Sequence, residues 1–170
     1  MKKGNLILRK ASEADIPCIW EIIRQSKVLM AKLGRHQWNE TYPSVENIIA
    51  DISKSGAYVA CLDSTIAAYV FVTGEKEPAY DALDGKWLSV QPYLVIHRLA
   101  VDISHRGKGI AGFIMDSAES MCLEKGLHSI KVDTNHDNSE MLNLLKSRGY
   151  AVCGTVEYPQ GRRLAFEKLL

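Results

Sequence analysis

Apolar residues repeat with two different spacings along this chain, and the alternation between them predicts the order of strands and helices. In the first half, period-two alternation predicts a strand over residues 5–10. A period of three to four then predicts a helix that starts near Asp15 and ends at Gly34, with Pro17 in its first turn. The other elements expected in this half are a helix at residues 45–54, with Ile48, Ile49 and Ile52 facing inward, and the two strands of a hairpin at residues 57–62 and 66–73.

The second half alternates in the same way. A glycine-rich loop leads into a helix over residues 109–125, which Gly126 ends. Asp137 and Glu140 have the spacing of a capping box and are expected to start the next helix, which carries Met141, Leu144 and Leu145. The remaining strands are expected at residues 93–101, 128–134, 150–158 and 162–169.

The resulting order, β-α-α-β-β-β-α-β-α-β-β, predicts an α/β protein of the α+β mixed-sheet type, with a central sheet flanked by helices. The strands on either side of the glycine-rich helix should be parallel neighbours joined by a right-handed crossover. A chain of 170 residues with 46% hydrophobic residues has the size of one domain, residues 1–170. Two irregular segments, residues 34–44 and 74–91, interrupt the order, and the second is far longer than a usual connection.

Composition argues against several classes of partner. Twenty-one basic and 20 acidic residues leave a net charge of +1, so nothing overall favours nucleic acid or an anionic membrane. No apolar run approaches the length of a membrane span, and the histidines have no spacing typical of a metal site. Four scattered cysteines indicate reduced core residues of a cytoplasmic protein: Cys18, Cys61, Cys122 and Cys153.

A basic, glycine-rich segment follows the strand that ends at Val101. Gly107, Gly109 and Gly112 allow the backbone to approach an anion closely, and the helix that they open offers unpaired N–H groups. Arg106 and Lys108 add positive charge at the same place. The segment therefore predicts a local site for a pyrophosphate or a similar anion.

The same glycines fit the G-x-G-x-x-G pattern of dinucleotide-binding folds, with Asp133 in the position of a ribose-binding acid. Two features disfavour this alternative. In the dinucleotide pattern the glycines follow their strand directly, whereas residues 102–106 separate Val101 from Gly107. In addition, only one further β-α-β unit follows the loop.

A second interpretation is a family resemblance. The run from Arg106 to Ala111, RGKGIA, is similar to the R/Q-x-x-G-x-G/A signature of the GNAT superfamily of N-acetyltransferases, and Leu99-Ala100-Val101 precedes it as in that family. Asn135 and Asn138, followed by Gly149-Tyr150, resemble the family's downstream segment. The predicted order of elements resembles the GNAT fold from end to end.

The resemblance implies acetyl-CoA as the cosubstrate. Its pyrophosphate would lie on the backbone amides of Arg106, Gly107, Lys108, Gly109, Ile110 and Ala111. Its pantetheine arm would pair with the main chain of Leu99, Ala100 and Val101, in a V-shaped opening between two parallel strands. Asn135 and Asn138 would lie near the thiol end. Homodimerisation through the last strands is a further implication of the family.

His97 is the candidate general base, because it lies on the same strand as Leu99 and Val101 and an unperturbed histidine titrates near pH ~6.5. Its position resembles that of a histidine in arylalkylamine N-acetyltransferases. A histidine hydrogen-bonded within the sheet is the alternative. The family often uses a tyrosine seven residues after the second asparagine as the general acid, but this chain has Leu145 there, which leaves the acid unassigned.

Four aromatic residues fall in the two irregular segments that are expected to border the acceptor pocket, and aromatic walls suit an amine or a small apolar acceptor. Ordinary anchoring of the loops is the alternative for each of them. Acidic residues of the second segment hint at a cationic acceptor, although such a run is usually a solvated face. The aromatic residues are Trp38, Tyr42, Tyr80 and Trp87, and the acidic ones are Glu75, Glu77, Asp81 and Asp84.

Together these features predict an acetyl-CoA-dependent N-acetyltransferase. The expected acceptor is an amine of a small molecule, or the N-terminus or a lysine of a peptide or protein. The amine would attack the thioester directly, so catalysis would depend on positioning, an oxyanion donor and proton transfer. A catalytically silent acyl-CoA-binding sensor is the alternative from another class.

Overall fold

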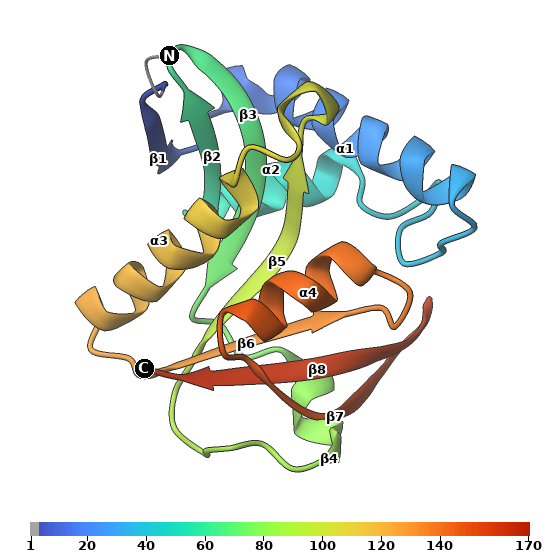
Figure 1. Cartoon of the computed structure of the whole chain (residues 1–170), viewed down its shortest axis with the longest axis vertical. Helices are drawn as coiled ribbons and strands as arrows, with labels where there is room; N and C mark the ends of the chain where they lie inside the picture. The colour runs from blue at the N-terminus through green and yellow to red at the C-terminus, as the bar shows by residue number, and fades with distance from the viewer. Residues whose placement is uncertain (1–3) are drawn as a thin grey trace.

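The computed structural model describes residues 4–170, which form an eight-stranded sheet and four α-helices (Figure 1). The helices are α1 (Ile16–Lys32), α2 (Val45–Ser53), α3 (Ile110–Glu124) and α4 (Ser139–Ser147). The strands are β1 (Leu6–Lys10), β2 (Ala57–Leu62), β3 (Thr65–Thr73), β4 (Asp84–Gly85), β5 (Leu94–Val101), β6 (Ser129–Thr134), β7 (Ala151–Tyr158) and β8 (Gly161–Leu169). The predicted mixed fold is confirmed, and the two-residue β4 is its one addition.

The sheet has the strand order β1-β2-β3-β5-β6-β8-β7-β4. Its neighbours are antiparallel except β5 and β6, which are parallel and joined through α3, as the sequence predicts. Their pairing is short, because it joins only Leu94 to Ile130 and Val95 to Lys131. Beyond these residues the two strands diverge, and Figure 1 shows the gap between them. The sheet is therefore open along the second half of β5.

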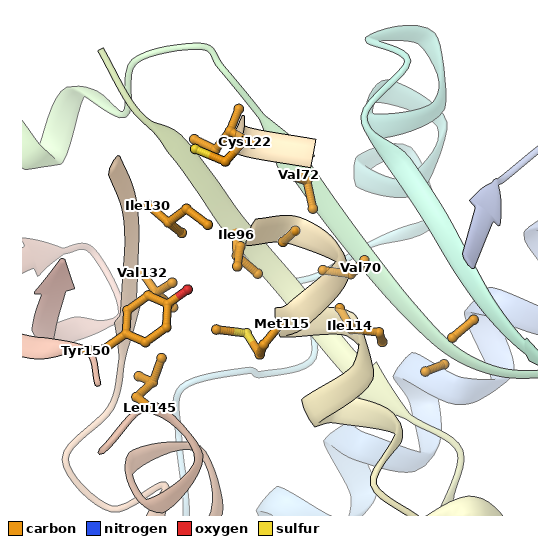
Figure 2. Close-up of a cluster of buried hydrophobic side chains, with 14 of the residues drawn as sticks. Val70, Val72, Ile96, Ile114, Met115, Cys122, Ile130, Val132, Leu145 and Tyr150 are labelled. Carbon is orange, nitrogen blue, oxygen red and sulfur yellow. The ribbon is translucent and has the colours of Figure 1, made fainter. Parts of the chain in front are cut away.

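Each face of the sheet is covered by one pair of helices. Alternate residues of β3 point to opposite faces, so Val70 packs with Ile114 of α3 while Tyr69 packs with Ile19 of α1. Figure 2 shows the first cluster, in which α3 and α4 meet β5 and β6. No helix within residues 4–170 has the length and apolarity needed to cross a membrane.

Two helix details differ from the sequence prediction. The expected inward residue Ile49 of α2 is 50% exposed, and Asp51 is buried instead. The expected capping box of Asp137 and Glu140 is wrong, because α4 begins one residue later with Asn138 as its N-cap. The side chain of Asn138 accepts a hydrogen bond from the Met141 N–H at 3.3 Å, as an N-cap asparagine does.

The long segment of residues 74–91 is held against the sheet by β4. Gly85 pairs with Gly154 of β7, and the two backbones approach so closely that a Cβ on either glycine would lie 2.2 Å from a carbonyl oxygen of the other strand. Gly154 also has φ = +154°, which L-residues rarely adopt. This contact fixes the middle of the segment, whose start borders the site described below.

We expect Gly154→Ala to lower the free energy of unfolding by about 2–4 kcal/mol, because the new Cβ meets the Asp84 carbonyl and the backbone is strained. For a domain of this size the loss corresponds to roughly 5–15 °C in Tm. Gly74→Ala is the matched control, since its Cβ would meet only Leu94, at 3.7 Å. Thermal unfolding followed by circular dichroism measures both variants, and equal Tm values would contradict the close contact.

Candidate functional site

Three cavities follow one another through the opening between β5 and β6. The first, here called the cleft, has a volume of about 410 Å³ and lies between α1, α3, α4 and the end of β5. The second, the neck, holds about 60 Å³. The third, the basin, holds about 530 Å³ and is bordered by β3, the start of the 74–91 segment and the β7–β8 hairpin.

The three cavities share walls. The cleft and the neck are both lined by Met30, Trp38, Leu99, Asn138 and Met141. The neck and the basin are both lined by Tyr42, His97, Arg98 and Arg163. The neck therefore connects the cleft with the basin.

The glycine-rich loop forms one end of the cleft. Gly107 and Gly109 have φ angles of +75° and +77°, and nothing lies within 4 Å of where their side chains would be. Gly109 is the N-cap of α3, so the unpaired N–H groups of the first helical turn open into the cleft. Arg106, Gly107, Gly109, Ile110 and Ala111 line the cleft, whereas Lys108 is exposed and does not.

Gly112 lines the cleft and has a further role, which is to make room for a basic side chain. A Cβ there would lie 2.3 Å from a guanidinium nitrogen of Arg148. The small residue lets Arg148 lie against α3, where its Nε donates to Asp116 at 3.0 Å. Arg148 also lines the cleft, so Gly112 makes room there for a positively charged side chain.

The open edge of β5 lines the cleft with Leu99, Ala100 and Val101. The N–H of Asp102 donates to the Ala67 carbonyl at 2.8 Å, on the β3 side. Successive N–H groups of a strand point to opposite edges, so the N–H of Val101 points to the open side. Asn138 lines both the cleft and the neck, whereas Asn135 lines neither, and its N–H donates to Gln37 at 3.0 Å.

Ser26 of α1 is a cleft residue that sequence reasoning missed. It is 4% exposed, lines the cleft and has an Oγ without a hydrogen-bond partner among residues 4–170. A buried hydroxyl is rarely left unpaired, so this one is available to a ligand. Ser26 is seven residues after Ile19, on the same apolar face of the helix. The sequence pattern therefore does not distinguish it from a core residue.

His97 lies where the neck and the basin meet. Its ring stacks on Phe71 with centroids 5.9 Å apart, and its Nε2 is 3.7 Å from Oε2 of Glu77. Burial, together with the positive charge of the neighbouring Arg98, lowers the pKa of His97 to about 4. The side chain is therefore neutral at physiological pH, and it is a weaker base than an unperturbed histidine.

Arg98 is a second residue that the sequence pattern did not reveal. It lies at a bulge of β5 with φ = +52°, and its guanidinium makes a bidentate ion pair with the buried Asp51 of α2. The Tyr69 hydroxyl also donates to Asp51, and Nη1 of Arg98 donates to the Tyr42 hydroxyl at 3.0 Å. This buried network fixes the wall that the neck and the basin share.

The four predicted aromatic residues separate into two pairs. Trp38 and Tyr42 line the cavities. Tyr80 and Trp87 line none of the three, and instead anchor the 74–91 segment: Tyr80 donates to Asp133 at 2.8 Å, and Trp87 Nε1 donates to the Tyr80 carbonyl at 2.9 Å. For this second pair, the structure favours the alternative of loop anchoring.

Leu145 and Asp133 each bear on an interpretation that the sequence left open. Leu145 is fully buried in the cluster of Figure 2 and has no proton to donate, so it supplies no general acid. Asp133 accepts hydrogen bonds from Tyr80, Tyr158 and Arg163, and its side chain is 4% exposed. A carboxylate held in this way is not free to bind a ribose, which disfavours the dinucleotide interpretation.

Comparison with known proteins points to one family. The sequence profile described as the acetyltransferase (GNAT) family matches residues 19–150. No curated protein matches the chain.

Many solved structures are similar. A GNAT-family acetyltransferase from Streptococcus agalactiae 2603 is 32% identical with a TM-score of 0.88, over 97% of this chain and 95% of that one. A ribosomal-protein-alanine N-acetyltransferase from Brucella melitensis is 20% identical, with a TM-score of 0.71 over 96% and 99% of the chains. The yncA protein of Salmonella typhimurium, solved with its cofactor acetyl-CoA, is 16% identical, with a TM-score of 0.70 over 97% and 94%.

The low pKa of His97 predicts a pH-dependent stability. Below pH ~6.5 the unfolded chain binds a proton at His97 that the folded protein does not bind until the pH nears 4. The free energy of unfolding should therefore fall as the pH drops through this window, by about 3 kcal/mol in total from this group. His97→Gln should remove this part of the fall, whereas replacing the exposed His136 by glutamine should keep it. Urea unfolding at pH 7, 5.5 and 4 measures the difference, and parallel curves for the two variants would refute the assignment.

Proposed function

Because the chain belongs to the GNAT family of acetyltransferases, we propose that it transfers the acetyl group of acetyl-CoA to a primary amine by direct attack of the amine on the thioester. The observation that carries this proposal is the passage from cleft to neck to basin through the β5–β6 opening. It gives the donor and the acceptor separate entrances and one meeting point.

The cleft fits acetyl-CoA, the cosubstrate of this family. Backbone N–H groups at the start of α3, with Arg106 beside them, suit a pyrophosphate. The open edge of β5 at Leu99–Val101 suits the amide groups of a pantetheine arm. On the opposite wall, Ser26 adds a hydroxyl that has no partner in the described part of the chain.

The bound cosubstrate supplies a thioester carbonyl that a neutral amine can attack. The N–H of Val101 is the proposed donor to the carbonyl oxygen as negative charge develops on it, because it points to the open side of β5. His97 is the proposed acceptor of the amine's proton and is neutral at physiological pH. Glu77 can take the proton onward, provided that its side chain and the ring close their present separation of 3.7 Å.

We assign no side chain as the general acid. Leu145 replaces the tyrosine that resemblance to the family would place there, and it is buried in the core. A CoA thiolate leaves without prior protonation more readily than an alkoxide, because thiols have a pKa of about 8.5. Water at the neck can then protonate it.

The first test is an acceptor screen in which the free thiol released from acetyl-CoA is measured across amines, amino acids and peptides. We expect transfer to at least one class, and a fall of about 100-fold in kcat for His97→Ala at pH 7.5 with that acceptor. Binding of acetyl-CoA with no transfer to any acceptor would instead support the silent sensor. An unchanged kcat for His97→Ala would remove His97 from the mechanism.

Ser26→Ala should weaken acetyl-CoA binding about 3- to 10-fold, the effect of losing one hydrogen bond to the ligand. The free protein should not lose stability, because the hydroxyl makes no bond within residues 4–170. Ser120→Ala on α3 is the control, since its hydroxyl donates to the Asp116 carbonyl at 3.2 Å and does not line the cleft. Isothermal titration gives the Kd values, and equal affinity for both variants would refute the contact.

A further inference from the structure

The charge of the basin differs from what the sequence suggested. Only two of the four acidic residues in the 74–91 segment, Glu75 and Glu77, line it, while Asp81 and Asp84 do not. Four basic side chains line it as well: Lys54, Lys76, Arg98 and Arg163. Arg98 and Arg163 are paired with Asp51 and Asp133, so the charges around the basin are nearly balanced and show no acidic excess that would select a cationic acceptor.

Several of these charges already have partners. Nζ of Lys54 is 2.8 Å from Glu75, and both side chains are about half exposed. Arg98 uses its Nε and Nη2 on Asp51 and its Nη1 on Tyr42. Lys54 and Arg98 therefore use some of their N–H donors within the protein and have fewer of them free for an incoming molecule.

Arg163 is different. Its side chain is 10% exposed and lines both the neck and the basin. A guanidinium has five N–H donors, but within residues 4–170 Arg163 makes one hydrogen bond, from Nη1 to Oδ1 of Asp133 at 3.1 Å. The group is held in place by that bond and by stacking over the ring of Tyr158, with its centre 4.4 Å from the ring centroid. A fixed guanidinium with unused donors is suited to a carboxylate, which it can bind with two parallel bonds.

We infer that the acceptor is an amino acid or a closely similar amino carboxylate, whose carboxylate binds Arg163 while its amine lies at His97. This inference rests on the proposed acetyl transfer. His97 and Arg163 both line the neck and the basin, so one small molecule can reach both. Arg163 is also among the charges that lower the pKa of His97, which places the two groups within electrostatic reach. The same positive charge favours the neutral, nucleophilic form of an amine bound beside it.

The test compares free amino acids with their own carboxamides, which keep the amine and lose the negative charge. Isothermal titration against the CoA-saturated protein gives the affinities, and thiol release from acetyl-CoA gives KM and kcat. We expect at least one amino acid to bind about tenfold or more tightly than its carboxamide, with a correspondingly lower KM. Carboxamides or decarboxylated amines that bind as well as the acids would overturn the inference, as would the failure of all amino acids to bind.

Arg163→Gln should weaken binding of the preferred amino acid by about 10- to 100-fold and leave the affinity of its carboxamide within about twofold. Arg162→Gln is the matched control: this neighbour on β8 is 62% exposed and pairs with Glu157. Arg163→Lys keeps the ion pair with Asp133 and loses the planar fork, so it should fold like the wild type and still discriminate less between acid and carboxamide. Equal losses for acid and carboxamide in both Arg163 variants would assign the residue a structural role and overturn the inference.

The measurements distinguish a failure of the proposed acetyl transfer from a failure of the proposed carboxylate site at Arg163. If no amine is acetylated but amino acids bind tightly and their binding depends on Arg163, the proposed transferase activity is wrong and the amino carboxylate site stands. If amines are acetylated with no preference for those that carry a carboxylate, the proposed transferase activity stands and the amino carboxylate site is wrong.

Discussion

The site depends on the shortness of one strand pairing. Within residues 4–170, β5 and β6 are the only parallel neighbours of the sheet, and they pair over two residues before diverging. Had they stayed paired to their ends, the N–H of Val101 would bond to β6 and no passage would cross the sheet. The divergence leaves backbone N–H and C=O groups of β5 without hydrogen bonds to a neighbouring strand. Such unpaired groups cost free energy unless water or a ligand bonds to them. Helices α1, α3 and α4 then wall the cleft, and the β7–β8 hairpin walls the basin.

Much of the fold could be predicted from the sequence because its signals are local. Apolar periodicity located α1 and α3, and Gly34 and Gly126 end these helices with φ angles of +68° and +70°, as the pattern requires. The glycine loop could likewise be found, because a close approach of backbone to an anion needs glycine at fixed positions. The two-residue β4 could not, since a pair of residues has no periodicity and its strand partner, β7, lies far along the chain.

The basin was mostly hidden in the sequence because tertiary contacts create it. Arg98 and Asp51 are separated by 47 residues, and Arg163 and Asp133 by 30. No spacing rule links such pairs, and in α2 the buried residue is Asp51, whereas Ile49, which the pattern placed inward, is exposed. Aromatic residues in loops were equally ambiguous: Trp38 and Tyr42 reach the cavities, whereas Tyr80 and Trp87 hold the chain in place.

Asp133 connects three separate parts of the molecule, because Tyr80 comes from the 74–91 segment, Tyr158 from the end of β7 and Arg163 from β8, and all three donate to its one carboxylate. The β7–β8 hairpin, which borders the basin, and the 74–91 segment are thus both joined to β6 through one carboxylate. A molecule that enters the basin would meet walls that are already held in place, so its binding would cost the protein little conformational entropy.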